Sequence, residues 1–146
     1  DKGVYVLAAT NHPERIDKAV LRTGRIDEMV YIDMPDIEAR KSLFALELSK
    51  LPTEGDIDTT HLSELTNGYN CSDISYIVKS AARKKFNETI KSPDGKKHGI
   101  TQEVLVEIIA TRSPSVSTKS LRDYERVRSE FSPKDKGLKP VTIGFR

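Results

Sequence analysis

One apolar stripe constrains the fold of this chain more than any other feature. From residue 74 to residue 90, apolar side chains recur every three or four positions, at Ile74, Ile77, Val78, Ala81, Ala82, Phe86 and Ile90. This spacing is the 3.6-residue period of an amphipathic α-helix, and the preceding Ser72-Asp73 pair is a good helix start. A helix with one apolar face needs other elements to pack against, so the stripe predicts a helical domain.

The sequence before this stripe predicts two more helices. Asp36 follows a proline and is a candidate N-cap for a helix over residues 37–48. Asp58 or Thr59 can cap a short helix that continues through residues 62–66. Both segments have the polar first residue and apolar interior that a packed helix requires.

Two further helices are predicted after the stripe. Thr101 precedes a segment whose inward-facing residues are Val104, Leu105, Ile108 and Ile109. A last helix begins at Ser117 or Thr118. The expected fold is therefore mainly α, with four to five helices in a domain spanning residues 36–131. Residues 132–146 are rich in Lys, Pro and Gly and form a predicted C-terminal tail.

Residues 1–35 have a different pattern and predict a small α/β piece. The apolar run Val4–Ala9 indicates a buried strand, and Glu28–Asp33 indicates a second one. Between them lie two arginines, Arg22 and Arg25, that are separated by a threonine and a glycine and so favour a tight loop.

The polar residues of this piece allow more than one reading. The amide of Asn11, at the carboxyl end of a strand, could contact a phosphate oxygen or orient a water molecule, but the same residues also suit a plain turn. Arg22 and Arg25 could bind an anion, or they could be solvated side chains paired with Asp27 and Glu28.

Three blocks, in order, resemble the motifs of one known family. Residues 8–13 read Ala-Ala-Thr-Asn-His-Pro and residues 21–27 read Leu-Arg-Thr-Gly-Arg-Ile-Asp, similar to the second region of homology of the AAA ATPases. Residues 68–74, Gly-Tyr-Asn-Cys-Ser-Asp-Ile, resemble the signature of its helical lid. Residues 114–131 resemble the Pro-Ser-Val-Ser ending found in the valosin-containing-protein branch and, in related form, in katanin- and spastin-like proteins. The resemblance covers most of the chain.

This resemblance implies a domain organisation and site residues. Residues 1–35 correspond to the C-terminal end of the large α/β subdomain, with two strands of its sheet, and residues 36–131 to the helical lid. Asn11 takes the place of the sensor asparagine. Arg22 and Arg25 take the places of arginine fingers that act on the γ-phosphate bound by a neighbouring subunit. The resemblance further implies nucleotide-binding residues at the start of a lid helix, namely Cys71 and Ser72.

The resemblance also implies an activity for the intact protein. It would use ATP and Mg²⁺ in a homo-oligomeric ring, a hexamer in this family, to remodel or unfold a protein substrate. The phosphate loop Gly-x4-Gly-Lys-[Ser/Thr] is absent, since the only Gly-Lys pair is Gly95-Lys96 and Lys97 follows it. We therefore expect a piece of an ATPase that alone is inactive and binds nucleotide weakly. A non-enzymatic lid-type module that docks a partner subunit is the alternative.

The composition narrows the classes of protein to which this chain could belong. The 146 residues carry a net charge of +2 and one cysteine, so an internal disulfide is excluded and a cytoplasmic protein is expected. No apolar run approaches the ~20 residues that cross a bilayer, and the histidines and the cysteine lack metal-ligand spacing, so neither a membrane nor a metal is expected. Residues 79–97 contain seven basic and two acidic residues. We interpret them as a solvated helix face rather than a nucleic-acid surface.

Overall fold

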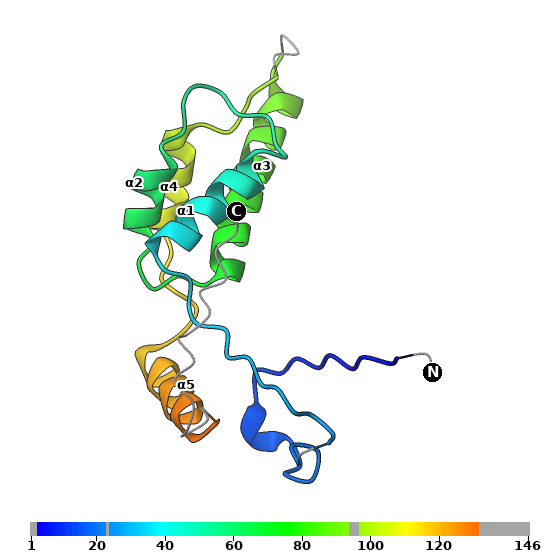
Figure 1. The fold of residues 1–146 in the computed structure, drawn as a ribbon. Coiled ribbons are helices and arrows are strands. Elements are labelled where there is room, and N and C mark those ends of the chain that lie inside the picture. The colour runs from blue at the N-terminus through cyan, green and yellow to red at the C-terminus, as the bar shows by residue number, and fades with distance from the viewer. Residues whose placement is uncertain (1–2, 23, 94–96, 132–146) are drawn as a thin grey trace. The chain divides into compact units, whose positions relative to one another are not determined.

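A computed structural model describes residues 3–22, 24–93 and 97–131 (Figure 1). The described part contains a short 3-10 helix, η1, and five α-helices, and it contains no β-strand. Their bounds are η1 Pro13–Arg15, α1 Ile37–Leu48, α2 Thr59–Leu65, α3 Cys71–Lys91, α4 Gln102–Ala110 and α5 Thr118–Phe131. The predicted mainly helical fold is confirmed, and the predicted tail over residues 132–146 lies outside the described residues.

The chain divides into two compact units. One unit is Asp33–Thr118 and contains α1 to α4. The other combines the residues up to Ile32 with Lys119 and the rest of α5.

Side-chain caps explain where the first two helices start. The Asp36 carboxylate accepts a hydrogen bond from the backbone N–H of Ala39 at 2.7 Å, so α1 begins at Ile37. The Asp58 carboxylate accepts from the N–H groups of Thr60 and His61 at 2.9 and 3.0 Å. The predicted caps of both helices are confirmed, with Asp58 rather than Thr59 in the second.

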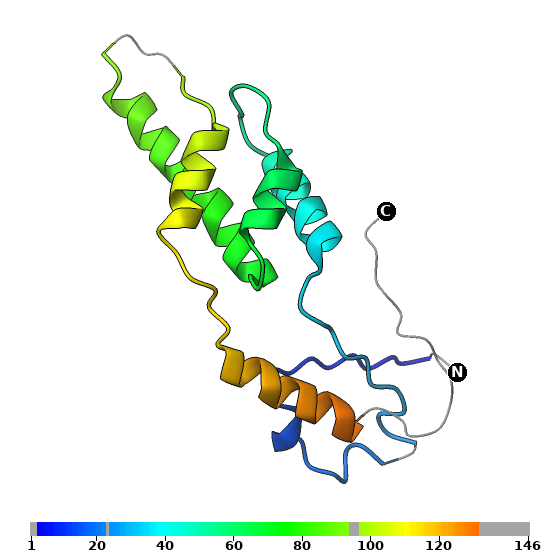
Figure 2. The same ribbon diagram turned by 90° about the vertical axis from the view of Figure 1, so that its left-hand side faces the viewer.

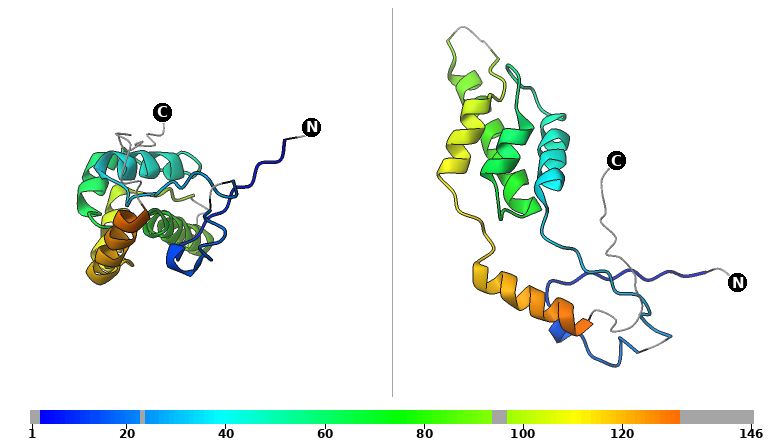
Figure 3. Two further views of the ribbon diagram at one scale, coloured as in Figure 1. Left: turned by 60° about the horizontal axis from the view of Figure 1, so that its bottom comes forward. Right: turned by 60° about the vertical axis from the view of Figure 1, so that its left-hand side comes forward.

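The core of the first unit lies between α3 and the three helices around it. Helix α1 packs against α2 and α3, and α4 packs against α3 and α2, as Figures 2 and 3 show from other sides. The buried apolar side chains come from all four helices and from two flanking segments: Phe44, Leu48, Leu62, Tyr69, Ile74, Ile77, Val78, Ala81, Ile100, Val104, Leu105 and Ile109. Shape-matched burial of this set is the main source of stability for the unit.

Two residues of the predicted stripe are not in this core. Phe86 and Ile90 are 63% and 66% exposed. An α-helix advances about 100° per residue, so Phe86 lies about 120° and Ile90 about 160° around the helix from Ile74. The prediction that these two side chains face the core was therefore wrong, although the helix itself extends through both.

A buried arginine links α1 to its neighbours. The Arg40 guanidinium donates from Nε and Nη2 to the Ser63 carbonyl, at 3.2 and 3.0 Å, and from Nη1 to the Pro35 carbonyl at 2.9 Å. Burial lowers the pKa of Arg40, and the nearby Asp36 carboxylate partly opposes this shift. The residue joins the end of α2 to the segment that leads into α1, a role that an amphipathic pattern does not reveal.

The loops after α1 and α3 are joined by a single parallel bridge. Ile100 donates to the Pro52 carbonyl and accepts from the Glu54 N–H, both at 2.9 Å, which pairs it with Thr53. A Cβ on the neighbouring Gly99 would lie 2.6 Å from the Thr53 carbonyl carbon. Glycine at this position therefore allows the two backbones to approach and brings Ile100 into the core.

The two predicted strands are not formed. In the described residues, neither Val4–Ala9 nor Glu28–Asp33 forms a strand or a β-bridge. Their side chains are exposed, for example Leu7 at 98% and Ile32 at 81%. A strand exists only as part of a ladder, because its N–H and C=O groups need partners. The apolar composition was read correctly, but the expectation of two strands was wrong for this structure.

Candidate functional site

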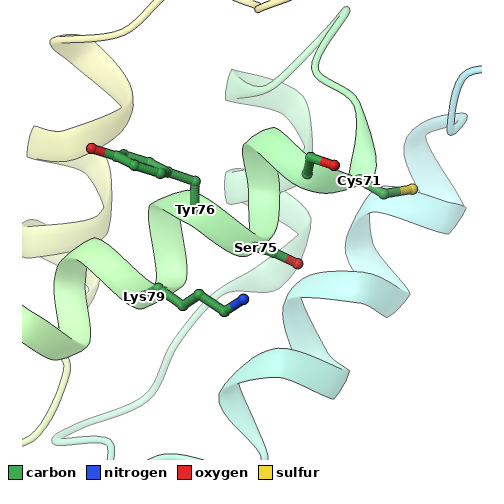
Figure 4. A pocket seen from close by; sticks show the side chains of 5 residues that line it. Cys71, Ser75, Tyr76 and Lys79 are labelled. Carbon is green, nitrogen blue, oxygen red and sulfur yellow. The ribbon is translucent and has the colours of Figure 1, made fainter.

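An open pocket of about 440 Å³ lies along the first half of α3 (Figure 4). Five side chains of this helix line it: Cys71, Ser72, Ser75, Tyr76 and Lys79. Cys71 and Ser72, the two residues expected to bind nucleotide, are therefore together at one end of the pocket. The other three were not predicted, although they follow Cys71 by one or two helical turns and so could have been found from spacing alone.

A reciprocal cap fixes the start of α3 beside this pocket. The Asn70 side chain accepts from the Asp73 N–H at 2.8 Å, and the Asp73 carboxylate accepts from the Asn70 N–H at 3.2 Å. This capping box makes Asn70 the N-cap, whereas the sequence indicated a start at Ser72-Asp73. As a consequence, Cys71 and Ser72 belong to the first turn and their orientation is set by the helix.

The Pro114-Ser115 segment is tied to the same cap. Ser115 donates to Asp73 Oδ2 from its backbone N–H at 3.2 Å and from Oγ at 3.0 Å. Asn70 Nδ2 donates to Ser115 Oγ at 2.9 Å. Asp73 is 4% exposed, so its carboxylate is satisfied by these donors rather than by water. Two sequence blocks more than forty residues apart thus form one hydrogen-bonded cluster.

Two tyrosines and an arginine support the next turn of α3. The Tyr69 hydroxyl donates to the Arg112 carbonyl at 2.8 Å, and the Arg112 guanidinium lies 3.9 Å from the centre of the Tyr76 ring. A side-chain hydrogen bond with Ser80, and secondarily the positive charge of Arg112, lower the pKa of Tyr76. The ring is consequently held in place on one border of the pocket.

The opposite border of the pocket faces α1. Ser75 Oγ donates to Glu47 Oε1 at 3.1 Å, and Figure 4 shows Tyr76 pointing to the other side of α3 from Ser75. Small side chains and hydroxyl groups thus lie at the positive end of the dipole of this 21-residue helix, and the Lys79 ammonium lies about two turns further along it. This combination suits a polar or anionic ligand that approaches the helix closely.

The paired-arginine loop belongs to the other unit and is a tight turn, as predicted. The Arg25 N–H donates to the Arg22 carbonyl at 3.1 Å, and the Gly24 N–H donates to Asp27 Oδ1 at 2.6 Å. Gly24 has a φ of +86°, in the left-handed region that favours glycine. Arg25 Nη1 donates to the Ala19 carbonyl at 3.0 Å. In the described residues, neither arginine forms an ion pair with Asp27 or Glu28.

Asn11 lies in the same unit as this loop, in an exposed bend. The His12 N–H donates to Thr10 Oγ1 at 2.9 Å, and His12 Nδ1 contacts Glu14 Oε1 at 3.1 Å, immediately before and within η1. The local structure is thus the turn that Thr-Asn-His-Pro favours. Asn11, Arg22 and Arg25 belong to one unit, and Cys71 and Ser72 to the other.

Two general findings bear on the type of site. Across the described residues, no cluster of three or more His, Cys, Asp or Glu side chains could hold a metal ion. In the same part of the chain, none of the helices combines the length and apolarity needed to span a membrane.

Known proteins similar to this chain include three with named functions. A cell division cycle protein 48 homolog of Archaeoglobus fulgidus is 33% identical over 138 residues, which are 89% of this chain and 19% of that protein. The human ATPase family gene 2 protein homolog A is 33% identical over 124 residues, covering 85% and 14% of the two chains. A putative cell division cycle ATPase of Plasmodium falciparum is 37% identical over 89 residues, covering 61% and 7%.

The chain belongs to the Cdc48-like AAA ATPases. The sequence matches no protein-family model. It spans less than a fifth of the length of these AAA ATPase relatives, so it represents one segment of the family's architecture. The alignment with the Archaeoglobus fulgidus protein covers 89% of this chain, so it includes both the arginine loop and α3.

Proposed function

We propose that this chain is part of an AAA ATPase that couples ATP hydrolysis in an oligomeric ring to the remodelling or unfolding of a protein substrate. The names of two relatives, a cell division cycle ATPase and an ATPase family protein, support the ATPase activity. The phosphate loop is absent from these 146 residues, so the activity is proposed for a protein that contains this segment and not for the segment alone.

The observation that carries the proposal is the pocket at the start of α3. Small side chains at Cys71 and Ser72 leave room for a planar base beside the first helical turn, and the Asn70, Asp73 and Ser115 cluster fixes that turn. Cys71 and Ser72 are proposed to contact the adenine of ATP. When bound with Mg²⁺, ATP supplies the phosphoryl group that is transferred to water.

Arg22 and Arg25 are proposed to act as arginine fingers on the nucleotide of a neighbouring subunit. The Gly24 turn presents two permanently charged guanidinium groups from one short loop. Such groups stabilise charge on the γ-phosphoryl oxygens in the transition state. Asn11 is proposed to contact the γ-phosphate or to orient the attacking water.

An Arg25→Ala variant of a ring-forming protein that contains this segment tests the proposal. We expect its kcat to fall by about 10³-fold or more while ATP binding is nearly unchanged, since the interaction forms mainly in the transition state. Arg15→Ala, which changes another exposed arginine of the same unit, should retain activity. Steady ATP turnover by the 146-residue chain alone would contradict the proposal. So would mixed rings in which Arg25→Ala impairs only its own subunit.

A further inference from the structure

The side of α3 that faces away from the core has its own regular pattern. Five exposed side chains follow one another at spacings of three and four residues: Tyr76, Lys79, Arg83, Phe86 and Ile90. Three of them are large and apolar or aromatic, with exposed fractions of 49%, 63% and 66% for Tyr76, Phe86 and Ile90. Alternating steps of three and four residues are the repeat by which one helix packs along another. We call these five residues the α3 seam.

The charge of the seam is positive and is not neutralised by nearby carboxylates. In the described part of the chain, Lys79 and Arg83 form no ion pair. Three carboxylates around α3 have other partners, and Glu47 of α1 accepts from Ser75. Glu88 pairs with Lys85 at 2.9 Å, and Glu107 of α4 pairs with Lys84 at 2.6 Å. The seam therefore has two free cations at its centre and apolar side chains at both ends.

We propose that the α3 seam docks an amphipathic helix of a protein partner that carries acidic side chains at its centre and apolar side chains at its ends. From Tyr76 to Ile90 the seam is about 21 Å long, which matches two heptads of a partner helix. Apolar contacts at the ends would supply affinity, and carboxylates facing Lys79 and Arg83 would set the register and select the partner.

The same charges argue against a second copy of this chain as the partner. An antiparallel pairing of two seams places Arg83 opposite Arg83, and a parallel pairing also places Lys79 opposite Lys79. Like charges at the centre of a helix pair disfavour that assembly. A nucleic acid is also a poorer fit, because the aliphatic Ile90 side chain offers no stacking surface and the seam holds only two cations.

Binding of designed helical peptides to the whole chain, followed by fluorescence anisotropy, tests this proposal. The probe is a peptide of about three heptads with leucine at the outer seam positions and glutamate at the central ones. We expect Arg83→Glu and Phe86→Ser each to weaken binding at least tenfold. The charge-matched control Lys50→Glu, an exposed residue after α1, should leave binding unchanged. Because Phe86 and Arg83 are exposed, circular dichroism should show all variants folded.

A peptide with lysine in place of the central glutamates separates specific from general binding. It should bind the Lys79→Glu and Arg83→Glu double variant more tightly than the unmodified chain. Equal binding of the two peptides would overturn the proposal, and so would a dimer in sedimentation that Phe86→Ser abolishes. Tighter binding of single-stranded RNA than of the acidic peptide, lost in Arg83→Glu, would assign the seam to nucleic acid instead. Tyr76 and Lys79 belong to both the seam and the pocket, but none of these outcomes depends on the proposed ATPase function.

Discussion

Residues 74–81 and residues 4–9 are both apolar segments, yet their surroundings differ completely. In α3, Ile74, Ile77 and Val78 are fully buried against the neighbouring helices. In the N-terminal segment, Tyr5 and Leu7 are 97% and 98% exposed. The helix satisfies its backbone internally and needs only apolar neighbours, which α1 and α4 provide. The extended segment needs backbone partners as well, and none is present in the described residues.

This contrast shows that an apolar sequence predicts that a segment requires packing partners, but does not predict which segments provide them. Each helix of the α1–α4 unit packs against other helices of the same unit, and together they enclose its core. Residues 3–22 and 24–32 contain turns with their own local hydrogen bonds but no strand. Substitutions in the two regions should therefore have very different energetic consequences.

The largest expected change in the free energy of unfolding distinguishes the core of the α1–α4 unit from residues 4–9. Phe44→Ala removes a fully buried ring from the core and should lower the free energy of unfolding by about 3–5 kcal/mol. Leu7→Ala removes a side chain that is 98% exposed and should change it by less than about 0.5 kcal/mol. Urea denaturation followed by circular dichroism measures both. Similar losses for the two variants would show that residues 4–9 are packed in solution.

A smaller effect is expected at the cap of α3. Asp73→Ala removes the acceptor of Asn70 and of both Ser115 donors, and should destabilise the unit by about 2 kcal/mol. Asp56→Ala, in an exposed loop, is the matched control and should have little effect. If the cap also orients the pocket, the thiol of Cys71 should react faster with a maleimide in Asp73→Ala at denaturant concentrations where the chain stays folded.

The smallest expected change in stability is at the start of α4, and it depends on pH. A hydrogen bond from its own backbone N–H, and next one with Thr101, lower the pKa of the Glu103 side chain. A carboxylate with a lowered pKa in the folded state stabilises it above the unfolded pKa and loses that contribution as the pH falls. Glu103→Gln should thus be slightly less stable than the unmodified chain at about pH 7 and equally stable at about pH 3. A difference that persists at low pH would assign the effect to packing.

The candidate site was predictable only where its signals are local. The Ser72-Asp73 pair before an apolar stripe indicated a helix start, and the family resemblance assigned Cys71 and Ser72 to it. Tyr76 and Lys79 were missed because no motif marks them, although their helical spacing from Cys71 places them along the same part of α3. The tie between Asp73 and Ser115 was also invisible, since a hydrogen bond across more than forty residues has no signature in one sequence. The proposed roles of Asn11, Arg22 and Arg25 remain predictions.

By itself the sequence determined the helices, the caps of α1 and α2, and the tight arginine turn. These features depend on periodicity and on side chains within a few residues, such as Asp36, Asp58 and Gly24. Tertiary structure alone decided which faces are covered. It buried the Arg40 guanidinium between two carbonyl groups, left Phe86 and Ile90 exposed, and gave Val4–Ala9 no ladder. Burial and strand pairing depend on distant partners, and a single sequence does not specify where those partners lie.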